Sequence, residues 1–204
     1  FSRGRIFLEQ EIDTGQYNNV KNIFWASGTA IMVRKNLFEQ AKKFDETFFA
    51  HMEEIDLCWR FHMLGYRVLA EPSSIVYHKN AVTLPMYSQK KYYLNHRNSL
   101  YMLCSNYSIP LTVYLLPLRI VLNVIAFFYA MSKLDWKHMT AIVMAIFWLI
   151  SHPHLIFKKR QKNKHIKSVR DRDIIKNMFR GSIVLVYYIL RKKTYREIVT
   201  NAES

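Results

Sequence analysis

Cysteine and acidic residues are scarce in this 204-residue chain, and both shortages narrow what it can be. Cys58 and Cys104 are the only cysteines, and neither belongs to a CxxC or a Cys/His cluster, which excludes a disulfide framework and a structural zinc site. There are 15 Asp and Glu against 30 Lys and Arg, so the net charge of +15 predicts an anionic partner: nucleic acid, anionic lipid or a phosphorylated substrate. An initiator Met and a charged-then-apolar leader are also absent, from which we expect a truncation that lacks an upstream segment.

Short apolar runs broken by glycine and proline predict a soluble α/β segment over residues 1 to about 80. Acidic residues followed by Gly65 predict a helix with a left-handed stop. Helices are expected over 35–42, 52–64 and 89–104, and extended pieces over 23–25, 29–33, 66–70 and 74–77.

Two long apolar segments follow, at residues 109–131 and 139–157, and Arg119 is the one Lys, Arg, Asp or Glu that they contain. At about 1.5 Å per residue, each can cross the roughly 30 Å of hydrocarbon in a bilayer. The short polar stretch between them predicts a transmembrane helical hairpin. A soluble two-helix core is the competing interpretation, favoured by Arg119, Asn123, Pro117 and Pro153.

Basic residues crowd the stretch directly after the second apolar segment, at 158–167. Because Lys and Arg gather at the cytoplasmic ends of membrane spans, this end is expected on the cytoplasmic side. The run would also suit anionic lipid head groups, although a solvated loop that only sets topology explains it equally well.

Three carboxylates stand close together at Glu53, Glu54 and Asp56, beside aromatic residues. Mutual repulsion and burial would raise the pKa of at least one of them, which suits a base that takes a proton from an alcohol. Acidic residues also favour the first turn of a helix because of its dipole. The spacing alone does not decide between these two interpretations.

Six short motifs around these carboxylates occur in one order and resemble the second half of family 2 glycosyltransferases, over about residues 20–105. They are the turn SGTA at 27–30, the loop FDETFF at 44–49, the helix start EEIDLCWR at 53–60, Gly65-Tyr66, Pro72 and His78.

The resemblance implies an α/β fold: the C-terminal part of a Rossmann-like GT-A domain with a mixed sheet. Residues 1–105 would be its acceptor-side half, with the donor half missing; 106–157 would form two transmembrane helices, and 158–204 a basic cytoplasmic helical tail. The implied enzyme moves a sugar from a nucleotide-sugar donor to a glycan or lipid-linked acceptor, with inversion at the transferred carbon.

The resemblance also implies roles for single residues. The acidic pair at the helix start supplies the catalytic base, which by position is Glu54, where the family usually has Asp, with Glu53 as the alternative. His78 matches a histidine that helps hold a divalent metal or the donor diphosphate, so Mn²⁺ or Mg²⁺, bound in part by the missing half, is the expected cofactor. A histidine that is merely hydrogen-bonded is the competing interpretation.

Small and aromatic residues are expected to bind substrate. Trp25, Ser27 and Gly28 would line a sugar site, since aromatic faces stack on pyranose rings and small residues let the backbone approach closely; core packing competes for Trp25. Arg97 lies in a stretch that resembles the R-YY-RN of the same family, and it either contacts phosphate or positions its helix.

A different class of protein fits part of the pattern: a non-catalytic membrane protein that binds anionic lipid or scaffolds partners. It would use the charge and the hairpin and would leave the acidic cluster without a role. Nucleic acid is not an expected partner, because the basic run abuts an apolar segment and no recognisable binding motif accompanies it. The expected partners are therefore the donor, the acceptor and membrane lipid.

Overall fold

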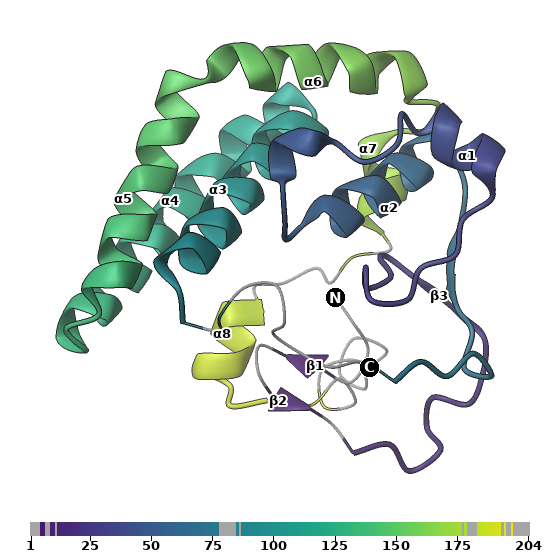
Figure 1. Cartoon of the computed structure of the whole chain (residues 1–204), viewed down its shortest axis with the longest axis horizontal. Coiled ribbons are helices and arrows are strands. Elements are labelled where there is room, and N and C mark those ends of the chain that lie inside the picture. Colours follow the sequence, from purple (N-terminus) through teal and green to yellow (C-terminus); the bar gives the residue numbers. More distant parts are fainter. Residues whose placement is uncertain are drawn as a thin grey trace.

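The structure is a computed structural model that describes residues 5–6, 9–10, 12–77, 85, 87–176, 178, 183–192, 194 and 197 (Figure 1). Its helices are α1 (Lys35–Gln40), the 3-10 helix η1 (Glu46–Phe48), α2 (Glu53–Met63), α3 (Gln89–Asn106), α4 (Ile109–Ser132), α5 (Trp136–Ser151), α6 (Pro153–Ile166), α7 (Asp171–Ile175) and α8 (Ile183–Tyr188). Its strands are β1 (Arg5–Ile6), β2 (Glu9–Gln10), β3 (Lys21–Ile23) and β4 (Val68–Ala70).

The expected α/β domain built on a mixed sheet is wrong, because most of the described residues are helical. The described strands form only two separate antiparallel pairs, β1 with β2 and β3 with β4. The residues at 29–33 and 74–77 have the β-branched composition of strands, but they pair with no strand among the described residues. An extended segment needs neighbouring strands to be stable, so these two segments stay irregular. Local composition therefore identified extended pieces, but within the described residues only those at β3 and β4 pair, as two strands, and the pieces do not join into one mixed sheet.

The three expected helices before residue 107 are confirmed as α1, α2 and α3, with ends shifted by a few residues. Gly65 has a φ of +83° and follows α2 directly, as a left-handed stop requires. The Ser88 side chain accepts a hydrogen bond from the Lys91 backbone N–H at 3.3 Å and so caps the start of α3.

The first apolar segment forms one helix of 24 residues, α4, which is long and apolar enough to cross a membrane. The second apolar segment does not form one helix. Helix α5 ends at Ser151, and the chain then turns by 68° into α6. Proline has no N–H for the preceding helix and disfavours helical geometry at the residue before it, so Pro153 starts a new helix and His152 stays outside both. Within the described residues, α5 and α6 together reach membrane length only as a bent pair.

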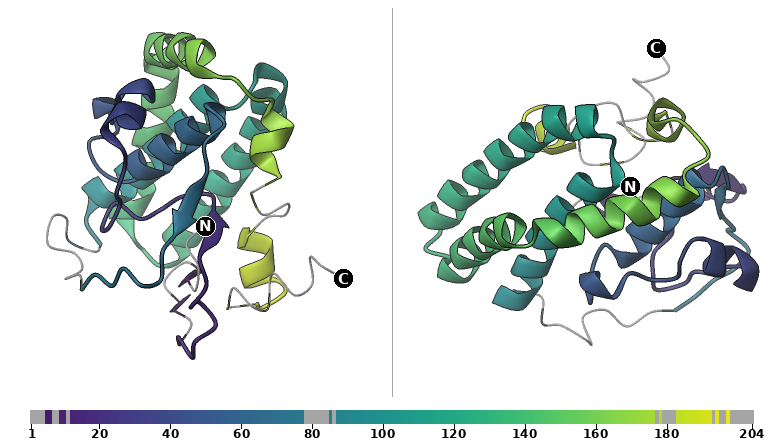
Figure 2. Two further views of the ribbon diagram at one scale, coloured as in Figure 1. Left: turned by 90° about the vertical axis from the view of Figure 1, so that its right-hand side faces the viewer. Right: turned by 90° about the horizontal axis from the view of Figure 1, so that it is seen from above.

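Two apolar clusters meet on α2. One side of α2 buries Leu57, Cys58 and Phe61 against Val68 of β4; the other buries its tryptophan and Met63 against Ile174 of α7. In the later part of the chain, α4 and α5 pack beside α3, and α6 crosses above α2 and α3 (Figure 2).

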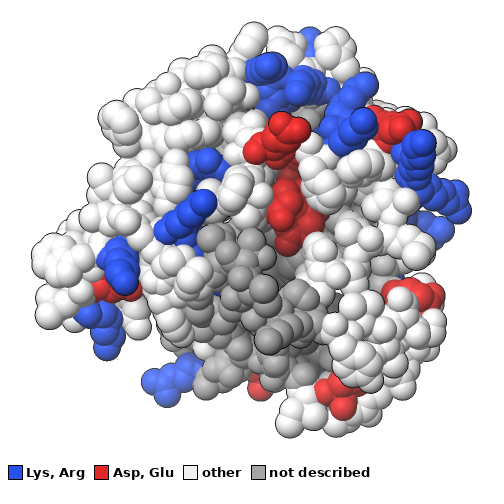
Figure 3. Space-filling view, in the orientation of Figure 1, with Lys and Arg blue, Asp and Glu red and all other residues white. Residues whose placement is uncertain are grey.

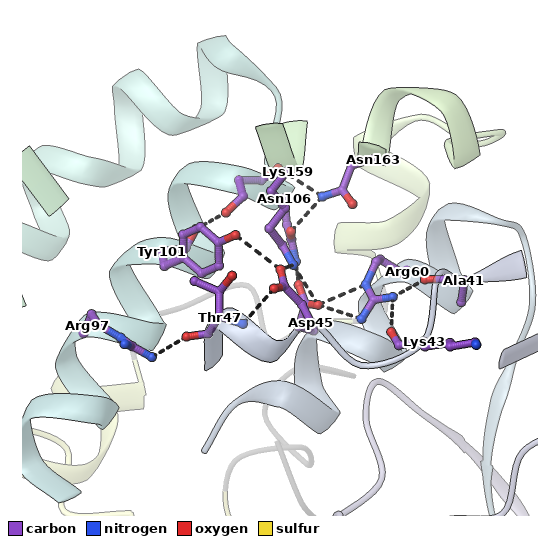
Figure 4. A network of polar contacts seen from close by, with 12 residues as sticks. Ala41, Lys43, Asp45, Thr47, Arg60, Arg97, Tyr101, Asn106, Lys159 and Asn163 are labelled. Atoms are coloured by element: carbon purple, nitrogen blue, oxygen red, sulfur yellow. Dashed lines mark hydrogen bonds and ion pairs between the residues drawn. The ribbon is translucent and has the colours of Figure 1, made fainter. Parts of the chain in front are cut away.

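A buried network of ion pairs joins α6 to α2 and to Asp45, the residue before η1 (Figure 4). The Lys159 ammonium, whose side chain is 4% exposed, lies 2.7 Å from Asp45 Oδ2 and 2.9 Å from Asp56 Oδ2. Asp56 also accepts hydrogen bonds from Arg60 Nε and from Asn106 Nδ2, each at 2.9 Å. Every charge in this cluster therefore has a partner of opposite sign, which a buried charge requires.

The basic run at 158–167 is consequently not solvated throughout. Lys159, Asn163 and Ile166 are buried on one face of α6, while Lys158, Lys162 and Lys164 are exposed. Asn163 donates to Asn106 Oδ1 at 2.9 Å and continues the network along α6. The helix α6 runs through position 157/158, where the sequence predicted a boundary between membrane segment and tail.

We expect Lys159→Met to destabilise the chain by roughly 3–5 kcal/mol, because it leaves two carboxylates near each other without their shared cation. The measurement is the free energy of unfolding by urea. Lys158→Met, at the exposed neighbouring position, is the matched control and should change that free energy by less than about 0.5 kcal/mol. Equal effects of the two substitutions would contradict a structural role for the Lys159 ion pairs.

The same network predicts a pH dependence of stability. Burial by itself raises the pKa of the Asp45 carboxyl, but the charge and hydrogen bond of Lys159, together with the hydrogen bonds of Thr47, outweigh burial and lower this pKa from 3.8 to about 2. The stabilisation that ionised Asp45 contributes is therefore complete above about pH 4 and is lost as the pH falls towards about 2. It amounts to about 2 kcal/mol, because one pKa unit corresponds to about 1.4 kcal/mol. The difference in unfolding free energy between wild type and Asp45→Asn should shrink over this range, and a constant difference would contradict it.

Candidate active site

The acidic pair opens α2 directly after a backbone segment of unusual conformation. Phe49, His51 and Met52 all have positive φ angles, of 63°, 67° and 72°, which non-glycine residues rarely adopt. Such residues cost about 1–3 kcal/mol each and persist only where surrounding contacts hold them, most often at functional sites. This segment sets the direction in which Glu53 and Glu54 enter the helix.

Asn98 of α3 holds this segment in place. Its buried side-chain amide donates to the backbone carbonyls of Phe48 at 3.0 Å, Ala50 at 2.8 Å and His51 at 2.7 Å. Its carbonyl oxygen accepts from Arg97 Nε at 2.8 Å. One side chain thus links α3 to the loop that presents the acidic pair.

Glu54 lies against the small-residue turn at Ser27 and Gly28. A Cβ added to Gly28 would lie 3.6 Å from Glu54 Cβ and 3.9 Å from its Cδ, which is ordinary van der Waals contact. The tertiary structure therefore brings together two of the positions at which the sequence predicted substrate binding and catalysis. A larger side chain at position 28 would occupy space beside the carboxylate.

Both glutamates have a buried carboxylate oxygen, Oε2, for which no hydrogen-bond partner exists among the described residues. Burial, and then the charge of Glu53, raise the pKa of the Glu54 carboxyl above 4.5. A carboxylate with a raised pKa and a free oxygen binds a proton more readily than a solvated one. Acidic side chains gather near the centre of the face shown in Figure 3, between basic ones. The helix-dipole explanation accounts for the position of the glutamates in α2 but does not account for these unpartnered oxygens.

His51 adds a neutral group beside the pair. Burial, and then the charge of Lys91, lower the pKa of its imidazole below 6.5, so the ring is uncharged near neutral pH. Its Nε2 is buried and has no partner in the described parts of the chain. The Lys90 ammonium lies 4.4 Å from the centroid of the Phe49 ring, so a cation also stands at this loop.

A pocket of about 690 Å³ adjoins the Ser27 turn. Trp25 and Ser27 line it, together with apolar residues of β3, β4 and α2, and Arg34 and Arg67 contribute cations. The two glutamates and Gly28 do not line it, so the pocket adjoins the acidic site without containing it. Trp25 also packs against both apolar clusters, which means that core packing and pocket lining are both true of it.

Arg97 contacts the backbone of η1 and the ring of Trp148 in α5. Its Nη2 donates to the backbone carbonyls of Thr47 and Phe48, at 2.6 and 2.9 Å, and its guanidinium lies over the ring of Trp148 at 5.1 Å. These contacts suit the interpretation that Arg97 positions its helix. Contact with a substrate phosphate stays a prediction.

The predicted metal ligand His78 lies outside the described residues. Within the residues that are described, no group of three His, Cys, Asp or Glu side chains could hold a metal ion. The described side chains are therefore no metal site by themselves, and the divalent cofactor stays a prediction.

Sequence reasoning missed two buried polar residues: Asn98, which holds the loop before the glutamates, and Lys159, which pairs with Asp45 and Asp56. Asn98 carried no signal beyond its place in a motif. Lys159 stands in a uniformly basic run, but the spacing of Lys159, Asn163 and Ile166 is that of one helix face, and this spacing was the available signal.

Comparison with known proteins finds no matching protein family and no matching solved structure. The chain is similar to N-acetylglucosaminyl-diphospho-decaprenol L-rhamnosyltransferase of Mycobacterium tuberculosis, in the strains CDC 1551 / Oshkosh and ATCC 25618 / H37Rv. In both cases 57 residues are 39% identical, which is 28% of this chain. The match spans only 19% of the relative's length, so it indicates a likeness to part of a glycosyltransferase.

We expect Asn98→Ala to loosen the segment at 49–52, because three carbonyls lose their shared donor. The free energy of unfolding should fall by about 1–3 kcal/mol. Exchange of the Asp56 amide hydrogen, which bonds to the Met52 carbonyl at 2.9 Å, should accelerate under native conditions. Asn95→Ala, a half-buried asparagine on the same helix, is the control, and equal exchange rates in the two variants would contradict the role given to Asn98.

Proposed function

We propose that this chain forms the acceptor side of a glycosyltransferase that moves a sugar from a nucleotide-sugar donor to a glycan or lipid-linked acceptor. The observation that supports it most is the pair of unpartnered glutamate oxygens beside the Ser27 and Gly28 turn. The partial likeness to a rhamnosyltransferase supports the same class of reaction independently of this geometry.

In the proposed reaction, Glu54 acts as the general base. Its carboxylate takes the proton from an acceptor hydroxyl while that oxygen attacks the anomeric carbon of the donor sugar. The bond from that carbon to the nucleoside diphosphate breaks on the opposite side, so the configuration inverts. Burial of the carboxyl favours this role, since it raises the proton affinity of Glu54 before the substrate arrives.

A divalent metal would supply charge to stabilise the leaving diphosphate. His78 is the residue of this chain that we propose as one of its ligands, by its match to the family motif.

The acceptor is proposed to be a sugar on a lipid diphosphate. The name of the relative describes such an acceptor, a sugar joined through a diphosphate to decaprenol. The long apolar helix α4 is consistent with work at a membrane. A non-catalytic lipid-binding protein would explain α4 equally well, but it would leave the buried glutamate oxygens without a purpose.

We expect Glu54→Gln, in the protein expressed at its natural length, to lower the rate of sugar transfer by about 10²- to 10⁴-fold. Binding of the nucleotide-sugar should change by less than about twofold, because the amide keeps the shape of the carboxyl and removes only its basicity. Radiolabelled sugar transfer and equilibrium binding measure the two quantities.

Glu46→Gln, at an exposed acid in η1, is the control and should leave transfer unchanged. Loss of transfer in Glu53→Gln with full activity in Glu54→Gln would move the base by one residue. Full activity in both glutamine variants would contradict the proposed reaction.

A further inference from the structure

The outer faces of α4 and α5 expose large apolar side chains along their length. The exposed fraction lies between 52% and 71% for Val113, Leu118 and Phe128 of α4 and for Val143, Phe147 and Ile150 of α5. Folded proteins rarely leave a continuous apolar surface of this kind in water. A partner of apolar character is therefore required.

The inner faces of the same helices are committed to α3. Tyr92 and Tyr101 of α3 contact His138 and Trp148 of α5, with ring centroids 4.3 and 5.6 Å apart, so α5 lies along α3 for most of its length. In α4, Asn123 Oδ1 lies 3.1 Å from a ring nitrogen of His96. The three helices therefore share one depth relative to any membrane.

The charge in α4 also faces inward. Arg119 is the one Lys, Arg, Asp or Glu of this helix, and its Nε is buried. Arg119 stands one helical turn before Asn123, whose Oδ1 contacts His96 of α3, so both residues lie on the face of α4 that meets α3. The outer face of α4 is left apolar.

Helix α3 cannot enter hydrocarbon together with its neighbours. Lys90 is exposed at its start, Arg97 bonds to the loop before α2, and Asn98 holds the segment that presents the glutamates. A bilayer across α4 and α5 would draw these charged groups and the candidate active site into the membrane, where charged side chains are strongly disfavoured. Helix α5 is also short, since its 16 residues extend about 24 Å against roughly 30 Å of hydrocarbon.

Basic side chains surround the apolar surface. Exposed Lys133 and Lys137 stand at the turn between α4 and α5, and exposed Lys158, Lys162 and Lys164 follow on α6. Figure 3 shows basic groups along the top edge and at the lower left, with a largely uncharged area between them. Such a border attracts an anionic lipid surface and repels a second copy of a chain with a net charge of +15.

We propose that the outer faces of α4 and α5 form a monotopic membrane-docking surface that lies in one leaflet of an anionic bilayer, in place of a hairpin that spans it. This surface corresponds to an interfacial amphipathic element made of two helices. The ion pairs of Lys159 hold α6 against α2 and against Asp45, so the basic border and the candidate active site keep one orientation towards the membrane. The inference depends on the helix packing and is independent of the proposed sugar transfer.

Labelling of single cysteines tests the topology. Leu134→Cys lies at the turn between α4 and α5, where Leu134 is 72% exposed, and Lys164→Cys lies on α6. In sealed membrane vesicles of one orientation, a membrane-impermeant maleimide should label both positions from the same side, at rates within about threefold of each other. The native Cys58 and Cys104 are buried and give little background. Protection of position 134 until detergent is added, with position 164 labelled at once, would establish a spanning hairpin and overturn the proposal.

Binding to lipid vesicles tests the surface itself. The full chain should float with phosphatidylcholine vesicles that contain about 30% phosphatidylglycerol and bind at least about tenfold more weakly to phosphatidylcholine alone. Ile150→Asp should reduce binding to the anionic vesicles at least about tenfold, whereas Ile75→Asp should not. The two isoleucines are matched, being 71% and 73% exposed, but only Ile150 lies on the proposed surface.

Equal loss in both variants would contradict the assignment of this surface. So would a chain that ignores vesicles and forms dimers that Ile150→Asp dissociates. Sugar transfer to a water-soluble acceptor analogue should survive Ile150→Asp, which separates a failure of this inference from a failure of the proposed function.

Discussion

The contact of one buried ammonium with two carboxylates holds this chain together. Lys159 of α6 meets Asp45, just before η1, and Asp56 of α2, so residues more than a hundred positions apart share one charge cluster. Removing Lys159 would leave Asp45 without its cation, and removing Asp56 would leave Arg60 without its carboxylate, which costs more than an exposed ion pair contributes. The path of the chain after α5 is therefore fixed by electrostatics as much as by apolar packing.

A second set of contacts, made by α3, connects the apolar helices to the candidate active site. Helix α3 contacts α4 through His96 and α5 through Arg97, and its Asn98 holds the strained segment before Glu53. The arrangement suits an enzyme whose acceptor arrives from a lipid surface, as proposed above.

Parts of the candidate site could be predicted from sequence, and others could not. The glutamates at the start of α2 were expected there, and the ion pair of Asp56 with Arg60, at 2.9 Å, follows from their spacing of one helical turn. The contact between Glu54 and Gly28 joins positions distant in sequence, and only the motif resemblance anticipated that both belong to one site. Nothing local marks Asn98 as the residue that supports the loop, because its three acceptors are backbone carbonyls without a sequence signature.

The sequence by itself determined the helices α1, α2 and α3, the apolar character of α4 and the helix stop at Gly65, because caps, periodicity and hydrophobic length act within a few neighbouring residues. Only the tertiary structure decided that the extended pieces do not join into one mixed sheet, that the second apolar segment turns at His152, and that Lys159 lies inside and not in solvent. Strand pairing and burial of charge depend on partners far away in the chain. Their free energies are set by which groups meet, and a local pattern does not contain that information.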